Sequence, residues 1–271
     1  MKICKAIELE DALFLKILLF GLSGVGKSTC AAQAPGPVLY IAAELNALSV
    51  VRQANPDADV VVVKTLADLR EILRYLMGEG AGKYKTVVID SLSEVQALIR
   101  NEMLAREVGK DVLTIQEWGK LGDKTHEIVR GFRELPCNLV VIALAEDAGD
   151  EGRRFIQPSL YGRASRDVPA LLTLVGYAFK EPGDAQSPGT KYRVLFESSG
   201  SVVTKTMRGL SPKMEPDVQS WIDAIQSYKK GVTPEVVTPP EASTEKPVKK
   251  VIRVVKRARN PIPTQTQEVP E

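Results

Sequence analysis

The sequence predicts an α/β fold in which a mostly parallel central sheet is flanked by helices. Short apolar runs that suit buried parallel strands alternate with segments whose apolar residues recur at helical spacing. A glycine-rich stretch, Gly21–Ser28, lies between the first apolar run and the first helical segment. Beyond residue 150 the strand-like runs are shorter and Gly, Pro and Ser turns separate them. We therefore expect antiparallel strands to extend the sheet in the C-terminal part.

The individual elements follow from the same patterns in chain order. Apolar runs predict strands over residues 14–20, 38–42, 59–64, 86–90 and 138–145. Apolar residues three or four positions apart predict helices over 66–77, from Leu92 to Met103 and from Trp118 to Leu135. Shorter strands are expected over 171–180, 191–197 and 201–206, and a last helix over 216–228.

The chain is predicted to hold one domain, residues 1–228, followed by a disordered tail, residues 229–271. The tail is rich in Pro, Thr, Glu and Val, contains no aromatic residue and has nine Lys or Arg against five Asp or Glu. Its basic segment, Lys249–Arg259, could bind DNA by counterion release or dock a partner such as a single-strand-binding protein. A solubilising end of a linker is an equally good interpretation.

Composition excludes several classes of protein. His126 is the only histidine, which excludes Cys/His metal clusters and Ser-His-Asp triads. Cys4, Cys30 and Cys137 are far apart and are expected to be reduced thiols in a cytosol-like compartment. The N-terminus does not resemble a signal peptide, and no apolar run approaches the ~20 residues of a membrane span. We expect a cytoplasmic protein with no membrane partner.

The glycine-rich stretch reads G-L-S-G-V-G-K-S, which fits the phosphate-binding pattern G-x-x-x-x-G-K-[ST] in its strand–loop–helix context. Glycines let the backbone wrap closely around phosphates, and the start of a helix adds positive potential. Lys27 is placed to reach the β- and γ-phosphates, and Ser28 to hold Mg²⁺. The sequence thus predicts a site for ATP and Mg²⁺ on nine residues: Gly21, Leu22, Ser23, Gly24, Val25, Gly26, Lys27, Ser28 and Thr29.

Two carboxylates are candidates for the chemistry at this site. Asp90 ends the apolar run T-V-V-I-D, at the sheet edge where ligands of open α/β sheets bind, and is the predicted second metal residue. The alternative is that Asp90 caps the following helix. Glu44 comes just after the run V-L-Y-I-A and is a candidate general base for the attacking water. The alternative for Glu44 is a solvated carboxylate at the end of a strand.

Three segments together resemble the RecA-like recombinase core: G-L-S-G-V-G-K-S, V-L-Y-I-A-A-E-L-N-A-L and T-V-V-I-D-S-L. The wider pattern is similar to small phage-encoded RecA-like ATPases of the single-strand-annealing type. That further resemblance rests on residues 86–94, 114–121, 157–164, 205–209 and 216–222. The resemblance as a whole covers about residues 12–228. It implies a RecA-like P-loop NTPase fold, and it implies that Glu44 is the catalytic base.

The resemblance also implies roles for residues outside the phosphate loop. Glu146 holds the place of a polar catalytic sensor, where RecA-type proteins typically have glutamine. A mobile DNA-binding loop is implied over residues 147–167; a solvated surface hairpin is the alternative. Lys205 and Arg208 resemble basic residues that reach a neighbour's γ-phosphate in filament-forming relatives, or else form an edge-strand charge pair. The implied DNA-binding residues are Arg153, Arg154, Arg163 and Arg166.

From the resemblance we expect an ATPase that acts on single-stranded DNA in phage homologous recombination or strand annealing, as a ring or filament in the cytoplasm of a bacterial host. One alternative is a helicase-like or AAA+ motor, which more often has a second acidic residue after the metal-binding one, where this chain has Ser91. A nucleotide-switched interaction module is another alternative. A small-molecule kinase is disfavoured because no Arg-rich lid is recognisable.

Overall fold

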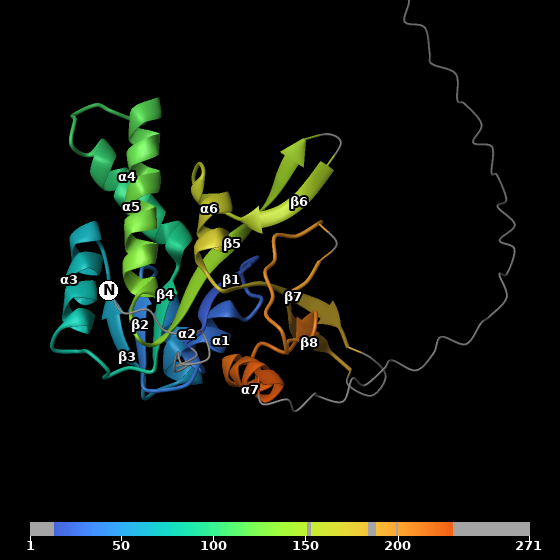
Figure 1. Cartoon of the computed structure of the whole chain (residues 1–271). Coiled ribbons are helices and arrows are strands. Elements are labelled where there is room, and N and C mark those ends of the chain that lie inside the picture. The colour runs from blue at the N-terminus through green and yellow to red at the C-terminus, as the bar shows by residue number, and fades with distance from the viewer. Residues whose placement is uncertain (1–13, 151–152, 184–187, 199, 230–271) are drawn as a thin grey trace, which may run out of the picture. The chain divides into compact units, whose positions relative to one another are not determined.

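A mostly parallel β-sheet forms the centre of the protein (Figure 1). The computed structural model describes residues 14–150, 153–183, 188–198 and 200–229. Within these residues the sheet has nine strands, eight of them in the order β3-β2-β4-β5-β1-β7-β8-β9, and β6 pairs with β5. The strands are β1 (Lys16–Gly21), β2 (Val38–Ala42), β3 (Asp59–Val62), β4 (Thr86–Asp90), β5 (Asn138–Asp150), β6 (Arg153–Pro158), β7 (Leu174–Pro182), β8 (Thr190–Leu195) and β9 (Lys213–Met214).

The six strands from β3 to β7 in this order run parallel, whereas β8 and β9 are antiparallel. The predicted fold class, an α/β P-loop NTPase with antiparallel strands towards the C-terminus, is therefore confirmed. The register places Gly21 opposite Leu144, and Ala42 opposite Asp90. Because the strands are parallel, the residues that follow β1, β2 and β4 all emerge at the same edge of the sheet.

Helices cover both faces of the sheet. Alternate residues of a strand point to opposite faces, so Ile17 and Leu19 of β1 join one apolar cluster and Leu18 and Phe20 join the other. The first cluster also contains residues of α1 (Lys27–Ala32), α2 (Ala47–Ala54) and α7 (Val218–Lys229). The second contains residues of α3 (Leu66–Met77), α4 (Leu92–Leu104), α5 (Ile115–Arg133) and α6 (Ala164–Leu171).

Local capping explains where the longer helices begin. Thr65 and Asp68 form a capping box at the start of α3, and Thr114 and Glu117 form another at the start of α5. None of the helices in the described ranges is long and apolar enough to cross a membrane.

Four segments differ from the preferred predictions. For residues 147–167 the implied loop had a surface hairpin as its alternative, and the hairpin is what the described residues form: β5 continues to Asp150 and pairs antiparallel with β6. Residues 164–171 form α6 although Pro169 removes one donor near its end. Residues 201–206 contain only two isolated bridges, at Val202 and Lys205, instead of a strand. Helix α2 was not predicted.

Candidate nucleotide-binding site

The glycine-rich loop lies between β1 and α1, as the sequence predicts, and its glycines meet specific steric demands. Gly24 and Gly26 have φ values of 75° and 86°, in the region that favours glycine. A Cβ at Gly21 would lie 2.3 Å from the carbonyl oxygen of Ala178 on β7. Gly26 is the N-cap of α1 and has no side chain that could accept a hydrogen bond. The first N–H groups of the helix are therefore not capped by this residue and can donate to a ligand.

Lys27 is buried inside the loop that it follows. Its Nζ donates to the carbonyl oxygens of Gly21 at 2.9 Å and Leu22 at 2.7 Å. An ammonium group has three donors, so one remains for a phosphate oxygen. Burial lowers the pKa of Lys27, and the carboxylates of Asp90 and Glu44 oppose that shift.

Asp90 ends β4 and is only 5% exposed. Its Oδ2 accepts a hydrogen bond from Ser28 Oγ at 2.7 Å and another from the phenol of Tyr40 on β2. Burial raises the pKa of Asp90, while the hydrogen bonds from Tyr40 and Ser28 and the charge of Lys27 act in the opposite direction. The carboxylate is thus oriented by two hydroxyl groups from two different elements.

The pair formed by Ser28 and Asp90 fits a magnesium ion. Both side chains present oxygen, which Mg²⁺ prefers, and they are already in contact. In the described part of the chain, no group of three or more His, Cys, Asp or Glu side chains is arranged to hold a metal ion. A magnesium ion would therefore be held by one carboxylate and one hydroxyl together with phosphate oxygens and water, which is its usual coordination at nucleotide sites.

Glu44 follows β2 and lies beside Asp90, because Ala42 and Asp90 are paired across β2 and β4. It is half-buried, and its Oε1 accepts a hydrogen bond from Ser91 Oγ at 2.9 Å. Ser91 is also the N-cap of α4, where its Oγ accepts from the backbone of Glu94. The helix cap considered for Asp90 is thus supplied by Ser91, which leaves Asp90 facing the loop.

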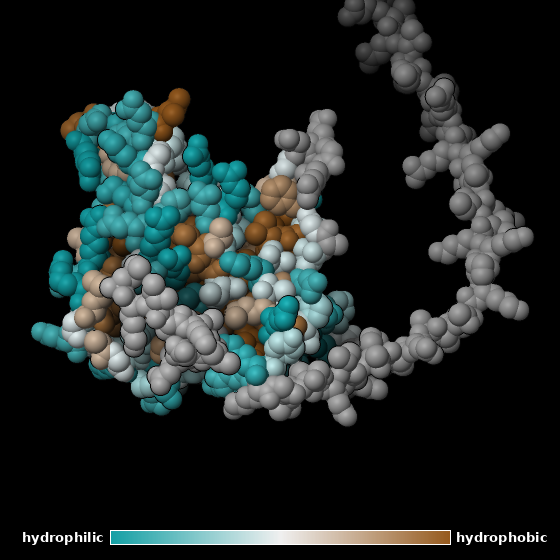
Figure 2. All heavy atoms as spheres, in the orientation of Figure 1, coloured by the Kyte–Doolittle hydropathy of each residue, from teal (hydrophilic) through white to brown (hydrophobic). Residues whose placement is uncertain are grey.

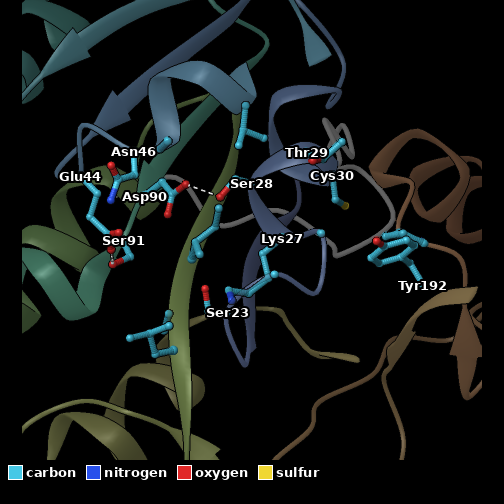
Figure 3. Close-up of a pocket in the computed structure, with 18 of the residues that line it drawn as sticks. Ser23, Lys27, Ser28, Thr29, Cys30, Glu44, Asn46, Asp90, Ser91 and Tyr192 are labelled. Atoms are coloured by element: carbon cyan, nitrogen blue, oxygen red, sulfur yellow. Dashed lines mark hydrogen bonds between the residues drawn. The ribbon is translucent and has the colours of Figure 1, made fainter. Parts of the chain in front are cut away.

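These residues share one pocket of about 600 Å³. Figure 3 shows Lys27 and Ser28 on the loop and first turn of α1, with Asp90, Ser91, Glu44 and Asn46 on one side and Thr29, Cys30 and Tyr192 on the other. Among the nine residues predicted to bind nucleotide, six line this pocket: Ser23, Gly24, Gly26, Lys27, Ser28 and Thr29.

Glu146 lies away from this pocket. Its carboxylate accepts hydrogen bonds from Gln157 Nε2 and Ser159 Oγ, both at 2.9 Å, at the base of the β5–β6 hairpin. The residues of β5 that line the pocket are Ile142, Ala143 and Leu144, and Leu144 is level with Gly21. Glu146, the expected sensor, therefore lies at the base of the β5–β6 hairpin and does not line the pocket.

Lys205 and Arg208 are also outside the pocket lining. Lys205 Nζ donates to the carbonyl oxygen of Leu172 at 2.6 Å and, at 3.4 Å, to that of Ala170 at the end of α6. Arg208 is exposed.

The arginines predicted to bind DNA lie on β6 and at the start of α6. Arg154, Arg163 and Arg166 are exposed, and Arg166 Nε is 3.6 Å from the carboxylate of Asp167. The side chain of Arg153 and the basic segment of the tail are outside the described residues. Tyr161, one of two aromatic residues between these arginines, packs on Trp118 with ring centroids 5.5 Å apart.

Sequence reasoning missed three residues of the site: Tyr40, Ser91 and Tyr192. Tyr40 is a polar residue inside an apolar strand, on the strand that precedes Glu44, and this was the available signal. Ser91 could have been found because serine is a preferred helix cap. Tyr192 is distant in sequence from the loop, and no local pattern connects the two.

The fold and the loop with its paired Ser28 and Asp90 define a P-loop NTPase. The sequence matches the family described as AAA domain over residues 13–208, so the chain belongs to this family. None of the curated proteins compared with the chain matches it. Three segments of the chain resemble the RecA-like core, and Ser91 after Asp90 spoke against an AAA+ ATPase. The family match supports the AAA description, and the phage recombination subfamily stays a prediction.

Proposed function

We propose that this protein hydrolyses ATP in a reaction that depends on Mg²⁺. The observation that carries the proposal is the contact between Ser28 and Asp90 in a pocket that also contains Lys27 and Glu44. A nucleotide-binding protein with no hydrolytic role needs the loop and the metal residues. It has no need for a second carboxylate beside them, and Glu44 is such a carboxylate.

Lys27, Glu44 and Ser91 each have a separate role in phosphoryl transfer. Lys27 donates its free N–H to the phosphate chain and stabilises the charge that develops there. Mg²⁺, when bound, neutralises charge on the β- and γ-phosphates. Glu44 accepts a proton from water as the water oxygen bonds to the γ-phosphorus and the bond to the leaving ADP oxygen breaks. Ser91 holds the Glu44 carboxylate through the 2.9 Å hydrogen bond.

The substitution Glu44→Gln tests the catalytic role directly. We expect ATP turnover to fall about 100-fold or more, the size typical of loss of a general base, with ATP affinity within about twofold of the original. Glu94→Gln is the matched control, since Glu94 is half-buried on α4 but does not line the pocket. Equal turnover in Glu44→Gln and the unmodified protein would rule out Glu44 as the base, and negligible turnover in both would favour a nucleotide-switched module.

We further propose that single-stranded DNA is the partner of this ATPase, in phage recombination or strand annealing. Support comes from the sequence resemblance and from the exposed side chains of Arg154, Arg163 and Arg166. Cations for phosphates, with a nearby aromatic ring such as Tyr161 for base stacking, are what single-strand binding requires.

A chain of hydrogen bonds between the pocket and the hairpin also supports this proposal. Ser93 Oγ accepts from the backbone of Leu144, which lines the pocket, and donates to the carbonyl oxygen of Ser159. Ser159 Oγ in turn donates to Glu146 on the hairpin. A change in the pocket on ATP binding would reach the base of the hairpin through these few contacts.

The test compares ATP hydrolysis with and without single-stranded DNA at low and moderate salt, beside Lys27→Ala. Stimulation by DNA that disappears in Lys27→Ala is the expected result. Hydrolysis that is indifferent to DNA would instead favour a helicase-like or AAA+-like motor that works on a protein partner.

We also propose that the active form is a homo-oligomer in which Lys205 or Arg208 reaches the nucleotide of a neighbour. Figure 2 shows hydrophobic side chains where α4 and α5 are joined, and Val108, Val112 and Ile115 are exposed apolar residues there. Exposed apolar groups that lie together are typical of protein contacts. A sedimentation profile that remains monomeric with ATP, Mg²⁺ and DNA would contradict this assembly.

A further inference from the structure

The nucleotide pocket has two ends, and the residues at one of them are not needed for phosphate chemistry. Asp90, Ser91 and Glu44 lie at the first end. Thr29 and Tyr192 lie on the opposite side of the first turn of α1 (Figure 3). Cys30 lies beside Thr29 at this second end, and Gln33 and Pro216 also line the pocket.

The proposed hydrolysis sets the direction in which a nucleotide lies in this pocket, and the present inference rests on it. The γ-phosphate must face Glu44 and Asp90, because the attacking water and the metal are held there. The phosphate chain then crosses Lys27 and Ser28, and the nucleoside leaves the loop on the side of Thr29. The nucleoside therefore meets the wall formed by β8.

Tyr192 is held at this wall by contacts on two sides. A Cβ built on Gly26 would lie 3.2 Å from Tyr192 Cδ1, so the ring rests against the phosphate loop itself. Lys180, its cross-strand partner on β7, places Nζ 5.3 Å from the ring centroid. The residue nevertheless remains 42% exposed, and it lines the pocket. An ordered aromatic ring with exposed surface beside a phosphate loop is suited to stacking on a base.

We propose that Tyr192 stacks on the nucleobase and that this second end of the pocket is a purine-nucleoside subsite. Stacking favours purines because their two fused rings offer more surface than a pyrimidine. Gln33, exposed at the end of α1, has both an amide donor and a carbonyl acceptor for the edge of the base. The antiparallel β7–β8 hairpin thus serves the site by supplying the base contact that the phosphate loop lacks.

Calorimetric titration of the full chain with ATP and with inorganic tripolyphosphate, each with Mg²⁺, separates the base contact from the phosphate contacts. For Tyr192→Ala we expect ATP affinity to fall about tenfold or more, with tripolyphosphate affinity unchanged, because base stacking is lost while the loop is intact. Tyr192→Phe should retain ATP affinity. Tyr192→Leu keeps an apolar side chain against Gly26 and should weaken ATP binding as alanine does.

Tyr228→Ala is the matched control, because Tyr228 is 40% exposed and does not line the pocket. Undiminished ATP affinity in Tyr192→Ala and Tyr192→Leu would overturn the stacking role. An equal loss of ATP and tripolyphosphate affinity in both variants would also overturn it, since the ring would then act by shaping the loop. Failure of the unmodified chain to bind either probe would refute the proposed nucleotide site itself.

Discussion

The phosphate end of the pocket and the β5–β6 hairpin differ in how firmly their polar side chains are held. At the phosphate end, Lys27 and Asp90 are buried and each makes two hydrogen bonds. On the hairpin, Arg154 is exposed to solvent. The first region is therefore organised before any ligand binds. Side chains of the second region lose conformational freedom when they bind, which reduces the net binding energy.

The largest expected effect follows from substituting Gly21, at the base of the phosphate loop, because its backbone lies close to the backbone of β7. Gly21→Ala would place a Cβ 2.3 Å from the carbonyl oxygen of Ala178, which is backbone of β7 and cannot rotate away. We expect the free energy of unfolding to fall by about 1–3 kcal/mol, as for other overpacked sites, and ATP binding to weaken with it. Urea unfolding followed by circular dichroism measures the change in stability.

Gly119→Ala on α5 is the control for this substitution. A Cβ there meets nothing within 4 Å, and alanine favours a helix over glycine by about 0.5–1 kcal/mol. The two substitutions should therefore change stability in opposite directions. A stable Gly21→Ala protein that binds ATP normally would show that the base of the loop is less rigid than its contacts indicate.

The second-largest effect is expected from removing the Tyr40 hydroxyl, and it tests whether this hydroxyl orients Asp90. Tyr40→Phe removes only the hydroxyl that donates to Asp90 Oδ2, and the ring stays packed in the core. Loss of a hydrogen bond to a charged group costs roughly 1.5–3 kcal/mol, so we expect about ten- to a hundredfold more Mg²⁺ to be needed for half-maximal hydrolysis. Nucleotide binding measured in EDTA should not change.

Tyr84→Phe is a comparable control, because the Tyr84 phenol donates to Asp59, which does not line the nucleotide pocket. An unchanged Mg²⁺ requirement in Tyr40→Phe would mean that Ser28 alone orients the carboxylate. A lower requirement would mean that the phenol competes with the metal for Asp90.

Tyr40 also illustrates how far the sequence could predict the site. The loop, Asp90 and Glu44 could be predicted because strand–loop–helix order and parallel strands bring the ends of neighbouring strands to one edge. The partners of Tyr40 and Tyr192 could not be predicted, because these contacts depend on which strands are neighbours and in what register. The order β2-β4-β5-β1 and the pairing of β7 with β8 are long-range facts that local periodicity does not contain.

The same limit explains the errors around residues 147–171. Residues 145–150 read A-E-D-A-G-D and residues 153–158 read R-R-F-I-Q-P, so neither segment has the polar–apolar alternation that predicts a strand, although the two pair as a hairpin. Pro169 hides α6 from a search for helical periodicity. By contrast, α3 was predicted with its observed limits, because its apolar stripe and its capping box indicate the same start.

The smallest expected effect concerns the exposed arginines of the second region. Arg154→Ala should weaken binding of single-stranded DNA only a few-fold, and the slope of log affinity against log salt should fall by about 0.7, the value for one phosphate contact on a single strand. Arg52→Ala is the control, since Arg52 is exposed on α2, which packs on the opposite face of the sheet from α6. Fluorescence anisotropy at several salt concentrations gives both numbers. An unchanged slope for Arg154→Ala would mean that DNA binds elsewhere on the protein. The β5–β6 hairpin would then be a solvated surface hairpin with no role in DNA binding.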